Sequence, residues 1–524
     1  MCIFFFCAGH AFIPLLGIED DEALFAQGIF APRAELYSIH IGRSNIPIML
    51  MSYLGALKSI VLRPVLVTFG VGLRTVREPM LLAGVASLWL FFLLLRRTAG
   101  YRAAYIGCAL LACDSLYLLT TCFDWGPVAL QHLLLLGGAL ALARFFHTRG
   151  TAALFGSGLL FGLALWDKAL AVWLLSGLAV GGLLVFPRQI LQLLTLRRAG
   201  IFLLALVIGA MPLILYNMTS KGGTLEGNFQ KNTAEIPSKG LFLINTFSGD
   251  GLFGWMTDED WQTPQPHPPQ GAVGRASAAI SAVFQHPRHS FFFYAFLLAL
   301  LVAPFAGSTQ FRLILWALIA LLVAWIQMAM NQNTGGSVHH TILLWPLPQF
   351  IVATSFAGVS ARFGRAGIRA VAAITVVVAL SSALVMNEYY AQMARDGGAK
   401  SWTDAIFPLA RYLRQQPPTT WAFALDWGIM DQLRLLERGK LHVGIGTDQI
   451  SKPEMTPEDK TYVRAIVADP ASVFIAHTKD FEFFPGHLEK LTQFAAESGY
   501  RREMVATIPD DFGRTVYEVY RFVK

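Results

Sequence analysis

The chain has 524 residues, of which 55% are hydrophobic and only 14% are charged, and its mean hydropathy is +0.51. This composition exceeds what a soluble globular protein normally carries, so water is excluded as the main solvent of the chain. The formal net charge of +7 needs no nucleic-acid partner, because the basic residues collect in short loops between apolar segments.

Apolar segments long enough to cross a hydrocarbon core of about 30 Å recur through the first three quarters of the chain. They predict eleven membrane helices, which cover approximately residues 2–17, 79–95, 102–121, 126–144, 152–166, 169–186, 199–216, 290–308, 312–330, 341–358 and 366–386. No small-residue cleavage site follows the first segment, which favours a retained anchor over a signal peptide. Asp167 and Lys168 interrupt the stretch 152–186 and predict the tip of a helical hairpin.

Arginine placement predicts the orientation, because translocation of short basic loops is disfavoured. The loops on one side carry Arg96, Arg97, Arg102, Arg144, Arg149, Arg188, Arg197, Arg198, Arg312, Arg362, Arg365 and Arg369. We therefore expect this side and the N-terminus to be cytoplasmic. The loops 18–78 and 217–289 and the tail from Asn387 are expected outside, in a protein of the plasma (inner) membrane.

The composition changes after Met386, where charged residues, Pro and Gly become frequent. We predict a membrane domain over residues 1–386 and a small extracytoplasmic α/β or α+β domain over 387–524. Its expected helices cover 403–415 and 487–498, and its expected strands cover 421–426, 472–476 and 516–523. The sequence Asp426-Trp427-Gly428 is either a site or the end of a strand, and the strand end is favoured.

Four consecutive carboxylates, Glu19 to Glu22, follow the first apolar segment. Mutual repulsion raises the proton affinity of such a cluster or attracts a cation. An aspartate there could act as the general base that deprotonates an acceptor hydroxyl. The alternative interpretation is a helix cap, since acidic side chains are favoured at helix N-termini.

Basic and histidine side chains near the exterior surface are candidates for binding a lipid phosphate. The apolar stretch 43–58 contains Pro47 and is predicted as an amphipathic helix in the outer interface. Lys58 at its end and Arg63 shortly after it either bind a lipid phosphate or only anchor the helix at the level of the headgroups. Lys168 forms either a self-neutralising turn with Asp167 or a functional group. One of His339 and His340 could hydrogen-bond a phosphate, whereas two adjacent histidines make a poor metal site.

At these residues the chain resembles the GT-C glycosyltransferases. A first helix, an exterior acidic pair, interfacial helices and an Arg-Xaa-Pro step at Arg77-Glu78-Pro79 are similar to the protein O-mannosyltransferase and aminoarabinose transferase branch. The resemblance covers residues 1–386 and the exterior C-terminal domain. It implies a mainly α polytopic fold and places the catalytic aspartate at Asp21, with Glu22 as its partner and Asp20 as the register alternative. It places a second acidic position at Asp124.

The resemblance implies an inverting enzyme that moves a sugar from a polyprenyl-phosphate donor to a lipid, polysaccharide or protein acceptor outside the membrane. The chain departs from the aminoarabinose transferases, because Asn45-Ile46-Pro47 stands where those enzymes have a Glu-Lys-Pro step. Their metal-binding glutamate and phosphate-binding lysine are therefore unmatched. Dependence on a divalent metal stays open, and so does the choice among Lys58, Arg63 and Lys168 for the phosphate.

Two other classes of protein compete with this hypothesis. A secondary transporter would show repeated halves and helices broken at the midplane, whereas this chain has no visible repeat and its polar residues cluster at the outer surface. A non-catalytic factor that binds lipid-linked sugars would tolerate the unmatched lysine and glutamate.

Overall fold

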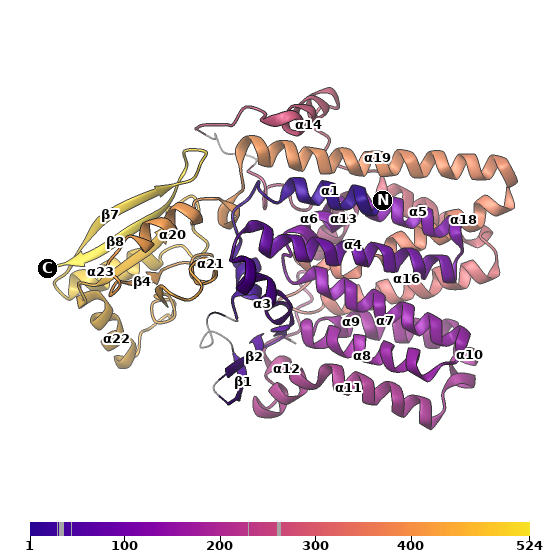
Figure 1. The fold of residues 1–524 in the computed structure, drawn as a ribbon, viewed down its shortest axis with the longest axis horizontal. Coiled ribbons are helices and arrows are strands. Elements are labelled where there is room, and N and C mark those ends of the chain that lie inside the picture. Colours follow the sequence, from indigo (N-terminus) through magenta and orange to yellow (C-terminus); the bar gives the residue numbers. More distant parts are fainter. Residues whose placement is uncertain (29, 31–35, 43, 229, 259–263) are drawn as a thin grey trace.

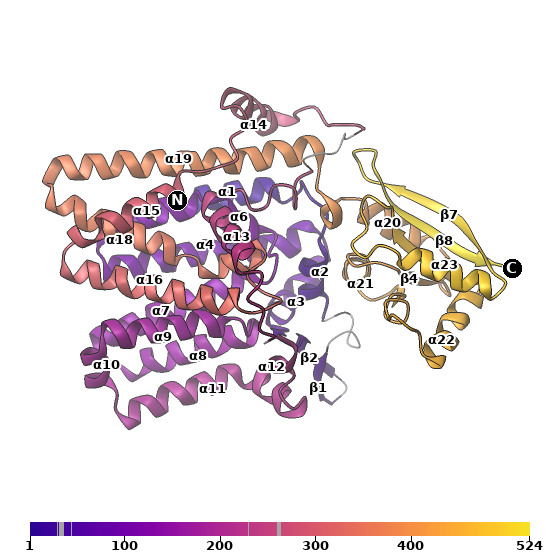
Figure 2. The same ribbon diagram turned by 180° about the vertical axis from the view of Figure 1, so that it is seen from behind.

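A computed structural model describes residues 1–28, 30, 36–42, 44–228, 230–258 and 264–524. A bundle of long helices makes up the membrane part, and a smaller domain built on a β-sheet lies at one end of it (Figure 1). Helix α2 (Asp20–Gln27) lies between these two parts (Figure 2). The prediction of a mainly α polytopic fold with a small C-terminal α/β domain is confirmed.

Each predicted membrane segment contains a helix. The helices of the bundle are α1 (Cys2–Phe12), α4 (Leu73–Thr98), α5 (Tyr101–Ala112), α6 (Ser115–Cys122), α7 (Val128–Thr148), α8 (Thr151–Asp167), α9 (Ala171–Val185), α10 (Pro187–Leu193), α11 (Leu196–Thr219), α15 (Phe292–Val302), α16 (Ser308–Ala329), α17 (Val338–Thr341), α18 (Leu347–Arg362) and α19 (Gly364–Asp396). Within the described residues, six helices are long and apolar enough to cross a membrane, or eight if the bent pairs α5–α6 and α9–α10 each count as one span. The predicted number of eleven spans therefore stays a prediction.

Small residues let neighbouring helices of the bundle approach closely. A Cβ at Gly158 or Gly162 of α8 would clash with the backbone of α11, and a Cβ at Gly209 of α11 would clash with the backbone of α8. In a lipid environment, where apolar side chains gain little by leaving the hydrocarbon, such close backbone packing is a main source of helix association. Helix α8 therefore has a fixed position, and Asp167 and Lys168 at its end share that position.

The loop between α1 and α4 differs from its prediction. Residues 44–51 form strand β2 (Ser44–Met51), which pairs with β1 (Tyr37–Ile41) and β3 (Leu54–Gly55), and helix α3 covers only Leu57–Phe69. The predicted interfacial helix over 43–58 is therefore wrong, except for its last two residues, and Arg43 lies outside the described residues. Ile46 and Ile48 are strand formers, and a run of apolar residues this short does not distinguish helix from strand by periodicity.

The loop between α11 and α15 contains three helices, α12 (Gly223–Asn228), α13 (Ile236–Ser248) and α14 (Gly271–Val283). Helix α14 lies outside the bundle, along α19 (Figures 1 and 2). Residues 259–263 of the predicted irregular stretch 258–271 lie outside the described part.

The C-terminal domain contains a five-stranded sheet in the order β5-β4-β6-β8-β7. Its strands are β4 (Trp421–Ala424), β5 (His442–Ile445), β6 (Ser472–His477), β7 (Arg501–Pro509) and β8 (Thr515–Val523), and its helices are α20 (Ile406–Arg414), α21 (Met430–Leu436), α22 (Pro457–Ala468) and α23 (His487–Glu497). β6 is the central strand, and all six of its residues are buried. Both faces of the sheet are therefore covered at its centre, as expected where parallel strands alternate with helices, whereas the edge strand β7 is mostly exposed.

The two parts meet at the loop that carries the acidic cluster. Helix α21 packs on α2, and the backbone N–H of Gly17 donates to the carbonyl oxygen of Trp402 at 2.9 Å. A Cβ at Gly17 would clash with the carbonyl oxygen of Thr403. Helix α19 continues to Asp396, ten residues beyond the predicted domain boundary at 386, which itself stays a prediction.

Candidate functional site

Helix α2 begins with a reciprocal cap. The Glu19 carboxylate accepts hydrogen bonds from the backbone N–H groups of Asp21 (2.8 Å) and Glu22 (3.3 Å). The Glu22 carboxylate accepts from the backbone N–H of Glu19 (3.4 Å). This arrangement satisfies N–H groups that a helix start otherwise leaves unpaired. Glu19 and Glu22 therefore serve as the cap that the sequence offered as an alternative, whereas the Asp21 carboxylate takes no part in it.

Arg77 of α4 holds this turn in place. Its guanidinium is fully buried and makes a bidentate pair with the Glu22 carboxylate, with both N–O distances at 2.8 Å. Its remaining donors reach the carbonyl oxygens of Ile13, Leu16 and Gly17 at 2.5–3.0 Å. All five N–H groups of the guanidinium are thus used. The Glu22 side chain is occupied by Arg77, and its geometry suits positioning of α2 better than a chemical step.

Lys58 and Asp124 form a second buried ion pair beside α2. The Lys58 Nζ lies 2.8 Å from the Asp124 Oδ2, and both side chains are almost completely buried. The other Asp124 oxygen accepts from the backbone N–H of Ala129 at 2.9 Å. The backbone of Asp124 has a φ of 45°, a left-handed conformation that aspartate tolerates better than most residues. The structure therefore joins two residues that the sequence had given separate roles.

Lys168 and Asp167 lie at the hairpin tip between α8 and α9, as predicted. The Lys168 Nζ donates to the carbonyl oxygen of Gly126 at 2.8 Å, and Leu54 of strand β3 bridges to the backbone of Lys168. Both Asp167 oxygens are buried without a hydrogen-bond partner among the described residues. Lys168 therefore ties the hairpin tip to the turn that carries Asp124.

Asp21 lies where these groups converge. Burial raises the pKa of Asp21 to about 6, while the nearby Lys168 and Lys58 oppose this rise and Trp125 adds a smaller opposing effect. The negative charge of Asp21 is also felt by Tyr53, whose pKa is raised to about 12, mainly by burial. A carboxyl group that titrates close to neutral pH is suited to accept a proton from a substrate and release it afterwards.

We expect the pH profile of kcat/KM to reveal this group. If Asp21 must be deprotonated to act, activity rises with pH and levels off above the Asp21 pKa of about 6. Lys168→Met removes a cation that lowers this pKa, so the rising limb should move to higher pH. The measurement is sugar transfer by the purified protein across pH values on both sides of the limb. A limb that stays in place in the Lys168→Met variant would contradict the assignment.

The other predicted phosphate ligands, His339, His340 and Arg63, lie at different distances from the cluster formed by Asp21, Lys58, Asp124 and Lys168. The ring of His339 meets the ring of Trp125 edge to face, with centroids 4.3 Å apart, and His340 stands against His339 at 4.0 Å. The hydroxyl of Ser337 is within hydrogen-bonding distance of the Nδ1 atoms of both histidines, at 3.1 and 3.0 Å. The structure thus brings His339 next to the cluster. Arg63 is exposed on α3, and no described contact joins it to the cluster.

Sequence reasoning assigned no role to several residues of the site. Trp125 directly follows Asp124, so its proximity could have been noticed. Asp431 of α21 acts on both Asp20 and Asp21 by its charge and accepts a hydrogen bond from Gln27 at 2.7 Å. The separation of about 400 residues between these partners leaves no local signal in the sequence.

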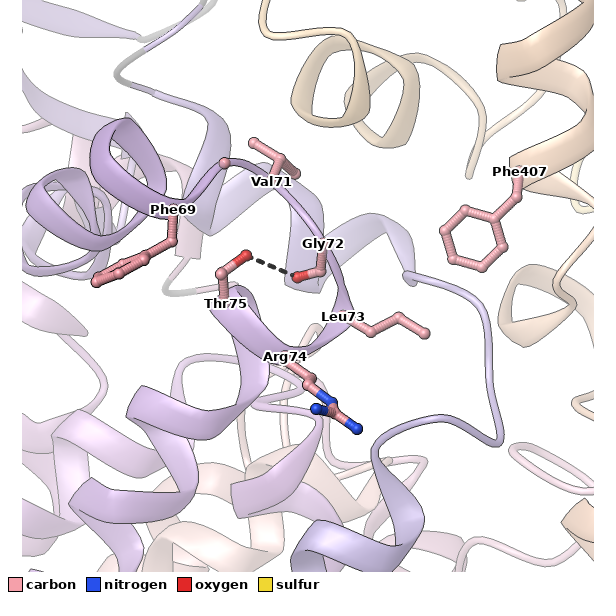
Figure 3. Close-up of a pocket in the computed structure, with 8 residues that line it drawn as sticks. Phe69, Val71, Gly72, Leu73, Arg74, Thr75 and Phe407 are labelled. Carbon is pink, nitrogen blue, oxygen red and sulfur yellow. Dashed lines mark hydrogen bonds between the residues drawn. The ribbon is translucent and has the colours of Figure 1, made fainter.

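A cavity of about 310 Å³ opens elsewhere, between the turn that joins α3 to α4 and helix α20 (Figure 3). Its lining includes Gly72, Leu73, Arg74 and Phe407, and the hydroxyl of Thr75 donates to the carbonyl oxygen of Gly72 at 3.0 Å. None of the candidate catalytic or phosphate-binding residues lines it. The cavity is therefore distinct from the acidic and basic cluster.

The described residues do not fit a metal centre. Among them, no group of three or more His, Cys, Asp or Glu side chains is arranged to hold a metal ion. Asp124 is paired with Lys58, and Glu22 is paired with Arg77. These two carboxylates are thus neutralised by cationic side chains, which leaves them poorly suited to act as metal ligands.

These features define a multi-pass membrane protein with a buried polar site at one end of its helical bundle. Residues 59–216 match the family model described as dolichyl-phosphate-mannose-protein mannosyltransferase. A comparison with curated protein sequences finds no match.

Solved structures resemble the chain over nearly its whole length. ArnT from Cupriavidus metallidurans bound to undecaprenyl phosphate is 12% identical to this chain, with a TM-score of 0.56. The match covers 99% of this chain and 97% of the ArnT chain. The same protein in the apo state is 14% identical with the same coverage and TM-score. The oligosaccharyltransferase of Archaeoglobus fulgidus in complex with Zn and sulfate is 12% identical, with a TM-score of 0.51. That match covers 90% of this chain and 68% of the oligosaccharyltransferase chain.

The predicted resemblance to the GT-C superfamily is confirmed by the family match and, over the whole chain, by the fold. The chain has the fold of the GT-C membrane glycosyltransferases. The matched segment begins at Ser59, one residue after Lys58, and includes Arg77, Asp124 and Lys168.

Proposed function

We propose that the protein is an inverting glycosyltransferase that uses a sugar linked to a polyprenyl phosphate, with Asp21 as its general base. The observation that carries the proposal is the position of Asp21, whose pKa is raised to about 6 by burial while Lys58 and Lys168 stand beside it. A base and cations in one site are what displacement of a phosphate from a sugar requires.

In the proposed step, an acceptor oxygen attacks the anomeric carbon while the bond from that carbon to the phosphate oxygen breaks. Asp21 takes the proton of the acceptor hydroxyl, and the leaving group departs as polyprenyl phosphate with its electron pair. Lys58, Lys168 and the neighbouring histidines are the candidate groups that stabilise the developing phosphate charge. A single displacement of this kind inverts the configuration at the anomeric carbon.

The arrangement of the bundle supports an extracytoplasmic site. Helix α10, in the arginine-bearing loop 187–198, lies at the end of the bundle opposite to the C-terminal domain (Figure 1). Arg312 near this end donates to the carbonyl oxygen of Val185 at 2.7 Å. Under the positive-inside rule, the arginine end is cytoplasmic, and the acidic cluster with the C-terminal domain lies outside the inner membrane.

The proposal is tested with purified protein and a set of polyprenyl-phosphate sugars. Mass spectrometry should identify one donor that is consumed, with release of polyprenyl phosphate and transfer of the sugar to an added membrane extract. Uptake of a labelled solute into proteoliposomes without any covalent transfer would instead favour a transporter.

Lys58→Met should weaken donor use strongly. Removing this ammonium takes a cation from the site and leaves the buried Asp124 carboxylate without its partner. We expect the KM for the donor to rise by at least about tenfold, which corresponds to one lost charge-assisted contact. Arg63→Met, on the exposed side of the same helix, is the matched control and should leave the KM within about twofold. Equal effects of the two variants would remove Lys58 from the donor site.

A further inference from the structure

Aromatic side chains form a connected path from Trp125, beside Asp124 in the candidate site, into the C-terminal domain. Trp125, next to Asp124, stacks on Trp255 with ring centroids 5.6 Å apart and an interplanar angle of 26°. Trp255 meets Phe483 at 6.5 Å, and Phe483 meets Trp427 at 4.8 Å, both edge to face. These four residues, called the aromatic path below, come from four separate segments of the chain.

The far end of the aromatic path is held by one buried carboxylate. Asp426 accepts hydrogen bonds from the backbone N–H groups of Trp427 (2.9 Å), Phe483 (2.9 Å) and Phe484 (3.1 Å). Its Oδ2 atom also lies 2.9 Å from Nδ1 of His477. Asp426 therefore fixes Phe483 and Trp427 relative to each other. The sequence Asp426-Trp427-Gly428, predicted as a strand end, follows strand β4 and also organises these two rings.

The aromatic path begins in the apolar core of the bundle, where Trp125 is buried, and continues into rings that are less buried. Trp255, Phe483 and Trp427 are only partly buried, and the buried indole N–H of Trp255 has no hydrogen-bond partner among the described residues. Trp402 lies nearby and is almost fully buried. Its indole N–H and the hydroxyl of Ser401 also have no hydrogen-bond partner among the described residues. Buried polar groups normally have partners, so these donors point to a ligand with acceptor oxygens.

Lys400 adds a positive charge beside the aromatic path. Its Nζ lies 5.4 Å from the centre of the Phe483 ring, and its backbone has a φ of 42°, in the left-handed region. A non-glycine residue is held in this region only where its surroundings enforce it, and such positions cluster at functional sites. The Lys400 side chain is exposed.

We propose that the aromatic path binds the saccharide portion of the acceptor, so that the acceptor is a glycan rather than a peptide. The inference rests on the proposed function, since it names the substrate that Asp21 would deprotonate. The C–H groups of a sugar ring are weakly positive and pack on the negative face of an aromatic ring, while its hydroxyl oxygens accept hydrogen bonds from indole N–H groups.

A peptide would use different features. Extended peptides are commonly recognised by main-chain hydrogen bonds to a sheet edge or by an apolar groove that fits a helix. The aromatic path offers partly exposed rings at Trp255, Trp427 and Phe483, together with side-chain donors. Because it starts at Trp125, a sugar bound along it would place a terminal hydroxyl beside Asp21. A glycolipid and a soluble polysaccharide share this chemistry, and both fit.

The test uses the full-length protein, its labelled polyprenyl-phosphate sugar donor, and three acceptor fractions prepared from the same cells. The fractions are glycolipids, soluble polysaccharide, and membrane protein freed of glycans. Label is expected in the glycolipid or the polysaccharide fraction, which also distinguishes these two sources. The acceptor concentration is expressed as the molar concentration of its sugar residues. Trp255→Ala and Phe483→Ala should each raise the KM for that acceptor by about tenfold or more. The KM for the donor should stay unchanged.

Two further variants keep the result interpretable. Trp427→Ala changes a partly exposed ring at the far end of the path, so it tests the inference even if Trp255→Ala fails to fold. Trp421→Ala is the matched control, because Trp421 is exposed and stacks only on Phe423 and His442 in the described residues. Its acceptor KM should equal that of the wild type.

The outcomes separate the inference from the proposed function. Label only in the protein fraction, or unchanged acceptor KM values in all three path variants, would overturn the glycan-binding role while donor turnover persists. A wild-type protein that consumes no polyprenyl-phosphate sugar at all would overturn the proposed function, and the acceptor assignment with it.

Discussion

Asp21→Asn should remove nearly all sugar transfer while leaving the protein folded in the membrane. The amide cannot accept the proton of the acceptor hydroxyl, and loss of a general base typically lowers a rate by roughly 10²–10⁴-fold. The Asp21 carboxylate takes no part in the cap of α2, which Glu19 and Glu22 supply, so the substitution should not disturb the helix. The measurement is kcat for transfer at a pH well above the Asp21 pKa of about 6, with donor binding measured separately.

Asp20→Asn is the matched control, because Asp20 is the register alternative for the base. Asp20 is buried, and its pKa is raised by burial and by the charge of Asp431 in the C-terminal domain. A neutral side chain there relieves repulsion between two carboxylates, so this variant should keep most of its activity. Full activity of Asp21→Asn, or loss of transfer in Asp20→Asn alone, would move the base away from Asp21.

Hydropathy predicted the membrane part well, because apolar length is a direct physical requirement for crossing a bilayer. Each predicted segment contains a helix, and the interruption at Asp167 and Lys168 marks the end of α8. The same reasoning placed an interfacial helix over 43–58, where the chain forms a hairpin. Pairing with β1 and β3 gives the strand its hydrogen bonds, and such pairing is a tertiary effect that a short apolar run does not encode.

The candidate site was predicted in its parts but not in its connections. Asp21, Asp124, Lys58 and Lys168 were each named, the two aspartates with the help of the GT-C resemblance. That Lys58 pairs with Asp124, and that Glu22 pairs with Arg77, could not be predicted, because these partners are separated by 66 and 55 positions along the chain and meet only through helix packing. The role of Asp431 at the domain junction was missed for the same reason.

Arg77 is expected to be the side chain on which the geometry of the site depends most. Its guanidinium joins the end of α1, the turn before α2 and the Glu22 carboxylate through five hydrogen bonds. Arg77→Met leaves the Glu22 charge and three carbonyl oxygens buried without this partner. Breaking a buried ion pair by removing one member typically costs about 3–5 kcal/mol. We therefore expect a lower thermal midpoint in detergent and loss of sugar transfer.

Two companion variants distinguish charge from geometry at this position. Arg77→Lys keeps the charge but cannot reproduce the planar fork that reaches both Glu22 oxygens, so it should recover stability only in part and activity very little. Arg77→Met combined with Glu22→Gln removes the unpaired charge and should regain stability relative to Arg77→Met alone, without regaining activity, because α2 and Asp21 still lack the guanidinium that ties them to the end of α1. Full transfer in the double variant would show that the position of Asp21 does not depend on the Arg77–Glu22 pair.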